Sequence, residues 1–284
     1  MTFRSAEEIV QDDQKGAAEL LEDVVESIQN MKRNEIGPYL ETLVTRRYSM
    51  TPLVNLANRI FISLEREKDI DSIVKDVEDE FLSRREKAVA NMKSLLEDND
   101  YTTILTHSYS STVVQSLTSA EKVKVLESRP KKEGRKTAKK LSTRGTKVEF
   151  WIDAGMCKAL ENVDCVVVGA DSISKEGVLN KIGTRPLALI SDPFDIQFYV
   201  VADTSKILSS KIPTPRGESH PPEEVWDNDY DVMVKNDYFE LTRLKRADLI
   251  TENGRMKGKK IKKIAEEKEV SKKLLKIHPL IKER

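Results

Sequence analysis

Apolar residues recur with the period of an α-helix through the first part of the chain. Ser5 and Glu8 have the spacing of a capping box, and the apolar positions that follow fall on one helical face: Leu20, Leu21, Val24, Val25 and Ile28. Gly37-Pro38 predicts a break. Further helices are expected from Thr51-Pro52, with Leu53, Leu56 and Ile60 inward, and along Ile73, Val77, Phe81, Ala88, Met92 and Leu95. The pattern predicts a small helical bundle as an N-terminal domain, residues 1–98.

The period changes after Asp98, where short β-rich runs alternate with stretches long enough for helices. The predicted strands are TTILTH (102–107), KVKVLE (122–127), KVEFWID (147–153), DCVVVGAD (164–171) and QFYVVAD (197–203), with DVMV (231–234) and ADLITE (247–252) as further candidates. The predicted helices between them include SSTVVQSL and GRKTAKKLS. This alternation is typical of a Rossmann-like, doubly wound, mostly parallel sheet. We therefore expect an α/β protein whose second domain, residues 99–284, carries a ligand pocket.

Composition narrows the class of protein. The 284 residues include 48 Lys and Arg and 48 Asp and Glu, and this zero net charge argues against a general polyanion binder. No apolar run approaches the roughly 18 residues needed to cross a membrane, and the N-terminus lacks a hydrophobic signal core. Two cysteines are too few for a disulfide scaffold. We expect a cytoplasmic globular protein with no membrane partner.

Polar residues gather just after the predicted strands. The set comprises His107-Ser108, Ser128-Arg129-Pro130, Asp153, Asp171 and Asp203-Thr204. Ligands bind at the carboxyl ends of the strands in open α/β sheets, although Asp, Ser and Thr at these positions also serve as helix caps. Asp171 stands out because an amide, an ammonium and a glycine follow it at Asn180, Lys181 and Gly183, ahead of a predicted helix. This chemistry suits a phosphate, with Arg129 as a second anion clamp.

The remaining candidates for chemistry are weaker. His107 ends an apolar strand, where a structural hydrogen bond is as good an explanation as catalysis, and neither His220 nor His278 has a metal partner at ligand spacing. Cys157 and Cys165 are expected to be small core residues. The sequence has no Walker loop and no GxGxxG fingerprint. We therefore expect no metal and no cofactor.

Four segments together resemble one known superfamily: ILTHSYS, LESRPKKEGRKTAKKL, VVVGADSISKEGVLNKIGT and FYVVADTSK. It contains the regulatory alpha, beta and delta subunits of translation initiation factor 2B and their archaeal relatives, together with the isomerases of 5-methylthioribose 1-phosphate and ribose 1,5-bisphosphate. The resemblance implies pairing through the C-terminal part, hence a homodimer or larger assembly. It also implies a subunit of translation initiation factor 2 as a partner.

The resemblance leaves two branches open. In the isomerases a cysteine works with the aspartate of the GAD motif to move a proton or hydride between C1 and C2 of the opened sugar. Here Asp171 is present, but Ser108 stands at the cysteine position, and a hydroxyl is a far weaker acid than a thiol. Lys15-Gly16-Ala17 also lacks the arginine–glycine pair that the isomerases use near the phosphate.

The favoured hypothesis is a non-catalytic regulatory subunit that binds a sugar phosphate or nucleotide monophosphate. The resemblance would place Arg129 and Lys181 on the phosphate and Asn180 and Asp171 on sugar hydroxyls, with Gly183 allowing close backbone approach and Ser108 on the pocket floor. The alternative is an aldose–ketose isomerase with Asp171 as its catalytic residue, and a third interpretation is a scaffold with an empty pocket.

Overall fold

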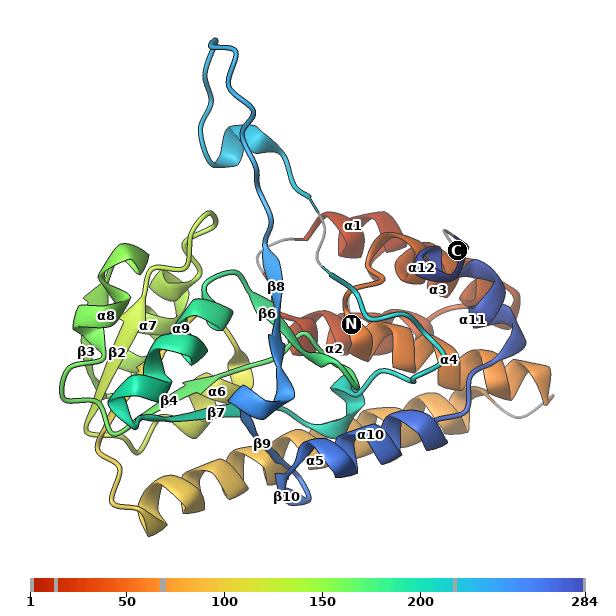
Figure 1. The fold of residues 1–284 in the computed structure, drawn as a ribbon. Helices are drawn as coiled ribbons and strands as arrows, with labels where there is room; N and C mark the ends of the chain where they lie inside the picture. Colours follow the sequence, from red (N-terminus) through yellow and green to blue (C-terminus); the bar gives the residue numbers. More distant parts are fainter. Residues whose placement is uncertain (1–2, 13–14, 67–69, 217–218, 283–284) are drawn as a thin grey trace.

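The computed structural model describes residues 3–12, 15–66, 70–216 and 219–282. Helices gather at both ends of the described chain and alternate with strands between them (Figure 1). The α-helices are α1 Ala6–Gln11, α2 Ala17–Gln29, α3 Arg33–Arg46, α4 Thr51–Glu65, α5 Ile70–Asp98, α6 Ser111–Ser116, α7 Gly134–Ser142, α8 Met156–Ala159, α9 Thr184–Ser191, α10 Gly258–Glu267, α11 Lys272–Ile277 and α12 Pro279–Lys282. Short 3-10 turns include η3 Thr204–Lys206 and η4 Pro222–Glu224.

The centre of the fold is a seven-stranded sheet in the order β10-β9-β7-β4-β1-β2-β3. Its strands are β1 Thr103–Thr106, β2 Lys122–Leu126, β3 Lys147–Trp151, β4 Cys165–Val168, β7 Gln197–Val201, β9 Asp248–Thr251 and β10 Gly254–Met256. All of these pairs are parallel except β9 with β10. The chain order therefore reverses between β1 and β4, which is the switch point of a Rossmann-like sheet. The predicted fold class is confirmed.

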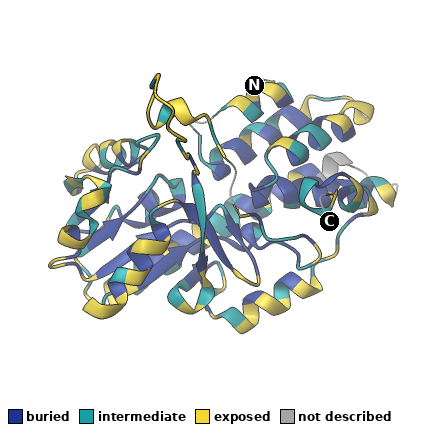
Figure 2. Cartoon of the chain, turned by 45° about the horizontal axis from the view of Figure 1, so that its top comes forward, coloured by how far each residue is buried: buried dark blue, intermediate teal, exposed yellow. Residues whose placement is uncertain are grey.

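Both faces of this sheet are covered, as a parallel sheet requires. One core packs Leu105, Val166 and Val200 against residues of α8, α9 and α10. The core on the other face packs Ile104 and Val167 against α5, α6 and α7. Strand β4 is buried along its whole length, which explains its uninterrupted apolar sequence. Figure 2 shows the buried strands between layers whose outer faces are exposed.

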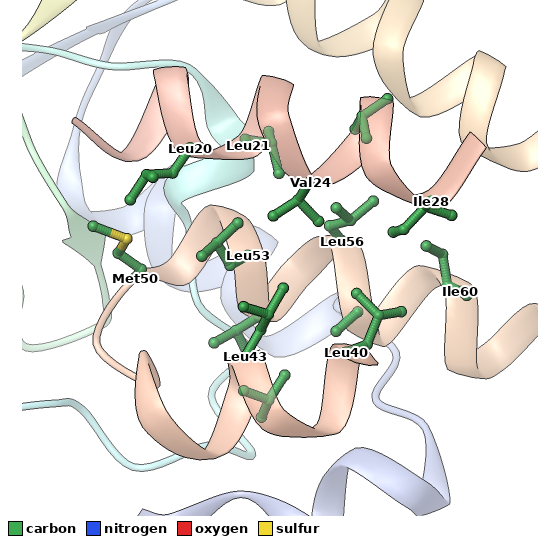
Figure 3. Close-up of a cluster of buried hydrophobic side chains, with 14 of the residues drawn as sticks. Leu20, Leu21, Val24, Ile28, Leu40, Leu43, Met50, Leu53, Leu56 and Ile60 are labelled. Atoms are coloured by element: carbon green, nitrogen blue, oxygen red, sulfur yellow. The ribbon is translucent and has the colours of Figure 1, made fainter. Parts of the chain in front are cut away.

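The N-terminal helices form a separate core that follows from their apolar period. Ser5 and Glu8 form the predicted capping box at the start of α1. The predicted inward residues of α2 and α4 are buried and interdigitate (Figure 3). The same core includes Leu274 and Ile277 of α11, so the end of the chain packs against its beginning.

Three local expectations were wrong or incomplete. Gly37-Pro38 does not break the helix but lies within α3. Ile36, Tyr39 and Leu40 are buried around it, and their packing offsets the backbone hydrogen bond that Pro38 cannot donate. The segment 231–234 is not a strand. A second, antiparallel sheet was not predicted; its order is β5-β6-β8, with β5 Ser172–Ile173, β6 Gly177–Lys181 and β8 Phe239–Arg243.

The proposed domain division at residue 98 stays a prediction. Helix α5 contributes Val77 and Phe81 to the helical core and Ala88, Met92 and Leu96 to the sheet core. This helix therefore joins the two cores, and Figure 1 shows it running beneath both.

A segment that contains η4 and leads into β8 projects from the body of the molecule, and we call residues 219–238 the arm (Figure 1). Its tip exposes large apolar side chains, with Tyr230 74% and Met233 80% exposed. Its base is ordered by a stack of His220 on Tyr238, whose ring centroids are 3.4 Å apart. The side chain of Asn236 also donates to the carbonyl of Pro221 at 2.7 Å.

We predict opposite effects of the same substitution at two glycines. A Cβ at Gly134 would lie 1.9 Å from the carbonyl oxygen of Leu126, whereas one at Gly37 would meet only Lys273 Nζ at 3.5 Å. Gly134→Ala should lower the free energy of unfolding by about 1–3 kcal/mol. Gly37→Ala, within a helix, should raise it by about 0.5–1 kcal/mol. Denaturant unfolding measures both, and equal effects would contradict the packing described.

Buried His278 should make stability depend on pH. Burial lowers its pKa to about 4, and neither ring nitrogen has a hydrogen-bond partner among the described residues. The unfolded chain takes up a proton near pKa about 6.5, so the folded state loses stability as the pH falls from about 6.5 to 4.

The variant His278→Phe tests this effect. Its loss of unfolding free energy between about pH 7 and pH 4.5 should be smaller than that of the unmodified chain by about 1–2 kcal/mol. Unfolding is followed in denaturant at each pH, and parallel curves for the two proteins would refute the assignment.

Candidate functional site

A cavity of about 90 Å³ lies at the carboxyl ends of β1 and β4, where the sheet order reverses, and we call it the strand-end cavity. Three predicted residues, Ser108, Asp171 and Lys181, line it together. The remaining walls come from the N-terminal helices, the start of α7 and the base of the arm: Asp12, Lys15, Gly16, Ala17, Arg47, Ser49, Met50, Tyr109, Glu133, His220, Tyr238 and Phe239.

Lys181 is the buried cation of this cavity, with 2% of its surface exposed. Its ammonium lies 2.5 Å from one carboxylate oxygen of Glu133 and 4.5 Å from the ring centroid of Tyr238. The second oxygen of Glu133 is buried and has no hydrogen-bond partner among the described residues. A buried cation needs a counter-charge to offset the loss of hydration, and Glu133 supplies it while keeping one acceptor unused.

Asp171 follows β4, and its backbone N–H donates to the carbonyl of Leu179 in β6 at 2.9 Å. Burial raises the pKa of its carboxyl, an effect that nearby Lys206 and Lys181 oppose and that Glu133 reinforces. The ammonium of Lys206 donates to the carbonyl of Ala170, the residue before Asp171. The site thus holds a buried carboxyl with a raised pKa near two ammonium groups.

The ends of β1 and β2 are joined through the hydroxyl of Ser128. It accepts the backbone N–H of Ser108 at 2.7 Å and lies 3.2 Å from His107 Nδ1. His107 Nε2 donates to the carbonyl of Ile182 at 2.7 Å, since a carbonyl can only accept. Burial lowers the pKa of His107, so the ring is held neutral. His107 is therefore a structural tie between the two strands and the turn before α9.

Ser108 and Ser128 both adopt left-handed backbone, with φ of +69° and +67°. Non-glycine residues rarely do so without a local reason. These left-handed residues turn the backbone sharply at the ends of β1 and β2. The backbone N–H of Ser108 can then donate to the hydroxyl of Ser128. The carboxylate of Asp153 accepts the backbone N–H groups of Ser128 and Arg129 at 2.8 and 2.7 Å, which holds this second turn.

The other predicted ligand residues lie outside the cavity wall. Arg129 is exposed, and its guanidinium donates to the carbonyl of Val225 in the arm at 3.2 Å. The amide of Asn180 is buried and donates to the hydroxyl of Thr184 at 2.9 Å. Gly183 has φ +102°, and a Cβ there would lie 2.8 Å from His107 Nε2, so it serves close packing of the turn. Their ligand contacts stay predictions.

Several wall residues were missed as candidates because they lie far from the strand ends in sequence. Lys15 and Arg47 come from the helical bundle, and His220 and Tyr238 from the arm. Burial lowers the pKa of His220, and its Nε2 atom has no partner among the described residues. The only sequence signal was the resemblance around residues 15–17, which marked this segment as belonging near a phosphate.

A second layer of charges fixes α2 against α7 behind the cavity. Glu19 lies 3.1 Å from Lys136 and accepts the hydroxyl of Tyr109 at 2.9 Å. Lys140 donates to the same hydroxyl at 2.6 Å. Lys136 and Lys140, two of the lysines of GRKTAKKLS, therefore contact side chains of the protein itself. These contacts position Tyr109 on the cavity wall.

Neither cysteine lines the cavity. Cys165 is buried in β4 as expected, but Cys157 is exposed, because α8 is a short helix whose outer side faces solvent. Within the described ranges, no group of three His, Cys, Asp or Glu side chains is arranged to hold a metal ion. None of the described helices is both long and apolar enough to span a bilayer.

The doubly wound sheet, with a cavity at its switch point beside the helical bundle, defines a Rossmann-like α/β protein. The chain belongs to the initiation factor 2 subunit family, which matches residues 4–258. The resemblance noted in the sequence is thereby confirmed.

The relatives include both branches of the superfamily. Ribose 1,5-bisphosphate isomerase of Methanocaldococcus jannaschii is 30% identical over 261 residues, which cover 84% of each chain. The crystal structure of translation initiation factor eIF-2B from Pyrococcus horikoshii matches with a TM-score of 0.70 at 29% identity, covering 88% of this chain and 94% of that one. The structure of 5-methylthioribose 1-phosphate isomerase from the same organism matches with a TM-score of 0.62 at 26% identity, covering 90% and 81%.

The Ser128 hydroxyl should be essential to the hydrogen-bond network that joins the ends of β1 and β2. Ser128→Ala leaves the N–H of Ser108 without its acceptor and should lower the free energy of unfolding by about 1–3 kcal/mol. Ser142→Ala, at the exposed end of α7, should change it by less than about 0.5 kcal/mol. Denaturant unfolding compares the two, and equal values would show that the network does not hold the site.

Proposed function

We propose that this chain is a regulatory subunit of the translation initiation factor 2B type that binds a sugar phosphate or nucleotide monophosphate without converting it. The observation that carries the proposal is the cavity at the switch point, which combines buried Lys181 with a hydroxyl at Ser108. The cation supplies anion binding, whereas a serine hydroxyl is too weak an acid for efficient proton transfer.

The charges of the cavity fit a ligand that is anionic at one end and rich in hydroxyls elsewhere. Lys15, Arg47 and Lys181 are cationic, and the first turn of α2 begins beside them at Ala17. Helix N-termini and cationic side chains bind phosphates. The carboxylates of Glu133 and Asp171 accept hydrogen bonds from sugar hydroxyls. A phosphorylated sugar would place its phosphate against the cationic groups and its hydroxyls against the carboxylates.

Binding requires the cavity to widen. Its volume of about 90 Å³ is below the roughly 300 Å³ at which ordinary ligand sites begin. The wall formed by His220 and Tyr238 belongs to the base of the arm, whose outer part is largely exposed. We infer that the arm moves to admit the ligand, and that the His220–Tyr238 stack then closes over it.

An isomerase is the second candidate, and one observation favours it. The raised pKa of the Asp171 carboxyl is the kind of shift found in groups that donate and accept protons near neutral pH. In that case Asp171 would carry the proton transfer with little help from Ser108.

Assembly into a homodimer or larger oligomer, contact with a subunit of translation initiation factor 2, and action in the cytoplasm complete the proposal. Family membership supports them.

Removing the buried cation should weaken ligand binding. We expect Lys181→Met to weaken binding of ribose 5-phosphate, measured by calorimetry, by at least about tenfold, because one charge-assisted contact is worth about 1.5–3 kcal/mol. Lys175→Met, at an exposed lysine of the β5–β6 turn, is the matched control and should bind normally. A variant that loses only stability would support the empty scaffold instead.

Ser108→Cys separates the two candidate functions. The unmodified chain should give no isomerised product from ribose 1,5-bisphosphate or 5-methylthioribose 1-phosphate above an Asp171→Asn control. If the cavity retains the rest of an isomerase, the thiol should raise turnover by about a hundredfold. Turnover by the unmodified chain would overturn the non-catalytic proposal.

A further inference from the structure

A second cavity, of about 200 Å³, lies where the helical bundle meets the sheet, and we call it the junction cavity. It is separate from the strand-end cavity and shares none of its lining residues. Its walls come from α2, α4 and α5, from η3, and from the residue that follows α10. Cavities between structural units are common ligand sites.

The inner wall of the junction cavity is apolar. Leu21, Leu56, Val77 and Phe81 line it and are all less than a tenth exposed. Such a surface gains free energy when an apolar body displaces water from it. The occupant that fits best therefore has a hydrocarbon part.

The charged groups of the junction cavity are predominantly cationic. Arg59, Arg84 and Lys268 line it against one carboxylate, that of Glu80. Glu80 pairs with both arginines, and Arg84 Nε also lies 3.7 Å from Glu252. An anionic group is thus favoured over a cationic one at the polar end of the cavity.

Lys268 and Ser205 can each form a further hydrogen bond or ion pair with a ligand. The ammonium of Lys268 donates to the carbonyl of Ile207, but has no carboxylate within ion-pair distance among the described residues. Burial, with the charge of Arg84, lowers its pKa to about 8 despite the nearby carboxylate of Asp203. The hydroxyl of Ser205 is buried and has no hydrogen-bond partner in the described part of the chain. Buried polar groups are rarely left without a hydrogen-bond partner, so each such group requires an explanation.

Two elements connect the junction cavity to the strand-end cavity. In η3, Ser205 lines the former while its neighbour Lys206 holds the carbonyl before Asp171. Helix α4 places Leu56 and Ile62 in the junction cavity, whereas Met50, just before its start, lines the strand-end cavity. The amide of Asn55 donates to the carbonyl of Ile207 at 2.9 Å and clamps η3 to α4.

We propose that the junction cavity binds a small organic anion with an apolar body, and that this effector is coupled to the strand-end cavity through η3 and α4. Its carboxylate lies by Lys268 and accepts the hydroxyl of Ser205, and its hydrocarbon part contacts Leu56 and Phe81. A ligand that shifts η3 shifts Lys206, and with it the backbone that carries Asp171.

Calorimetric titration of the full chain with hexanoate tests the site. Hexanoate should bind at one site and at least about tenfold more tightly than hexan-1-ol or hexylammonium. Lys268→Met should weaken hexanoate, but not hexan-1-ol, by about five- to tenfold. Equal affinities for the three probes, or no binding of hexanoate, would overturn the proposal.

Filling variants locate the binding. Ser205→Leu and Ile62→Phe enlarge side chains on two different walls, and either one that folds should abolish binding of hexanoate. Ser205→Ala adds no volume and should reduce affinity by less than about fivefold, the loss of one neutral hydrogen bond. Retention of full affinity in a folded filling variant would place hexanoate elsewhere and overturn the assignment.

The coupling has a readout that does not require a sugar phosphate to bind. In a chain carrying Ser108→Cys and Cys157→Ser, iodoacetamide reports access to the strand-end cavity, since the remaining Cys165 is buried. Saturating hexanoate should change the alkylation rate by at least about threefold, and the effect should disappear with Ser205→Leu. An unchanged rate would overturn the coupling, while failure of ribose 5-phosphate to bind would count only against the proposed function.

Discussion

The site depends on one constraint, the need of a buried ammonium for a counter-charge. Lys181 is almost wholly enclosed, and without Glu133 at 2.5 Å its loss of hydration would be uncompensated. Glu133 can reach it only because α7 begins directly against the end of β2, where Gly134 lies too close to the carbonyl of Leu126 for any side chain. The ion pair thus links the second sheet, through β6, to the main sheet, through α7.

The same arrangement leaves hydrogen-bonding capacity in the cavity wall. One oxygen of Glu133 remains without a partner among the described residues, and the pKa of Asp171 is raised by burial. Both are acceptors that a polyhydroxylated ligand would satisfy. Ser108 on the cavity wall supplies a hydroxyl, which is a far weaker acid than a thiol. The proposal of binding without conversion rests on this difference.

The sequence predicted the parts of the fold in which periodicity and topology agree. The five predicted strands, β1 to β4 and β7, and helices α6, α7 and α9 lie where the sequence indicated. The parallel order of the strands then brought Ser108 and Asp171 together. The second sheet was missed because β6 pairs with β8, which follows about sixty residues later, and no local pattern encodes such a pairing. Arg47, His220 and Tyr238 were missed as wall residues for the same reason, since only tertiary packing brings them to the strand ends.

We propose that the strand-end cavity binds a phosphorylated sugar without converting it, and a phosphorus NMR spectrum tests this most directly. Ribose 1,5-bisphosphate is mixed with a stoichiometric amount of the protein and followed over time. Binding without conversion should shift or broaden the resonances with no new product signals, and Lys181→Met should reduce the shift or broadening. New resonances from an isomerised product would show catalysis, and unperturbed spectra would show that the cavity does not bind this ligand.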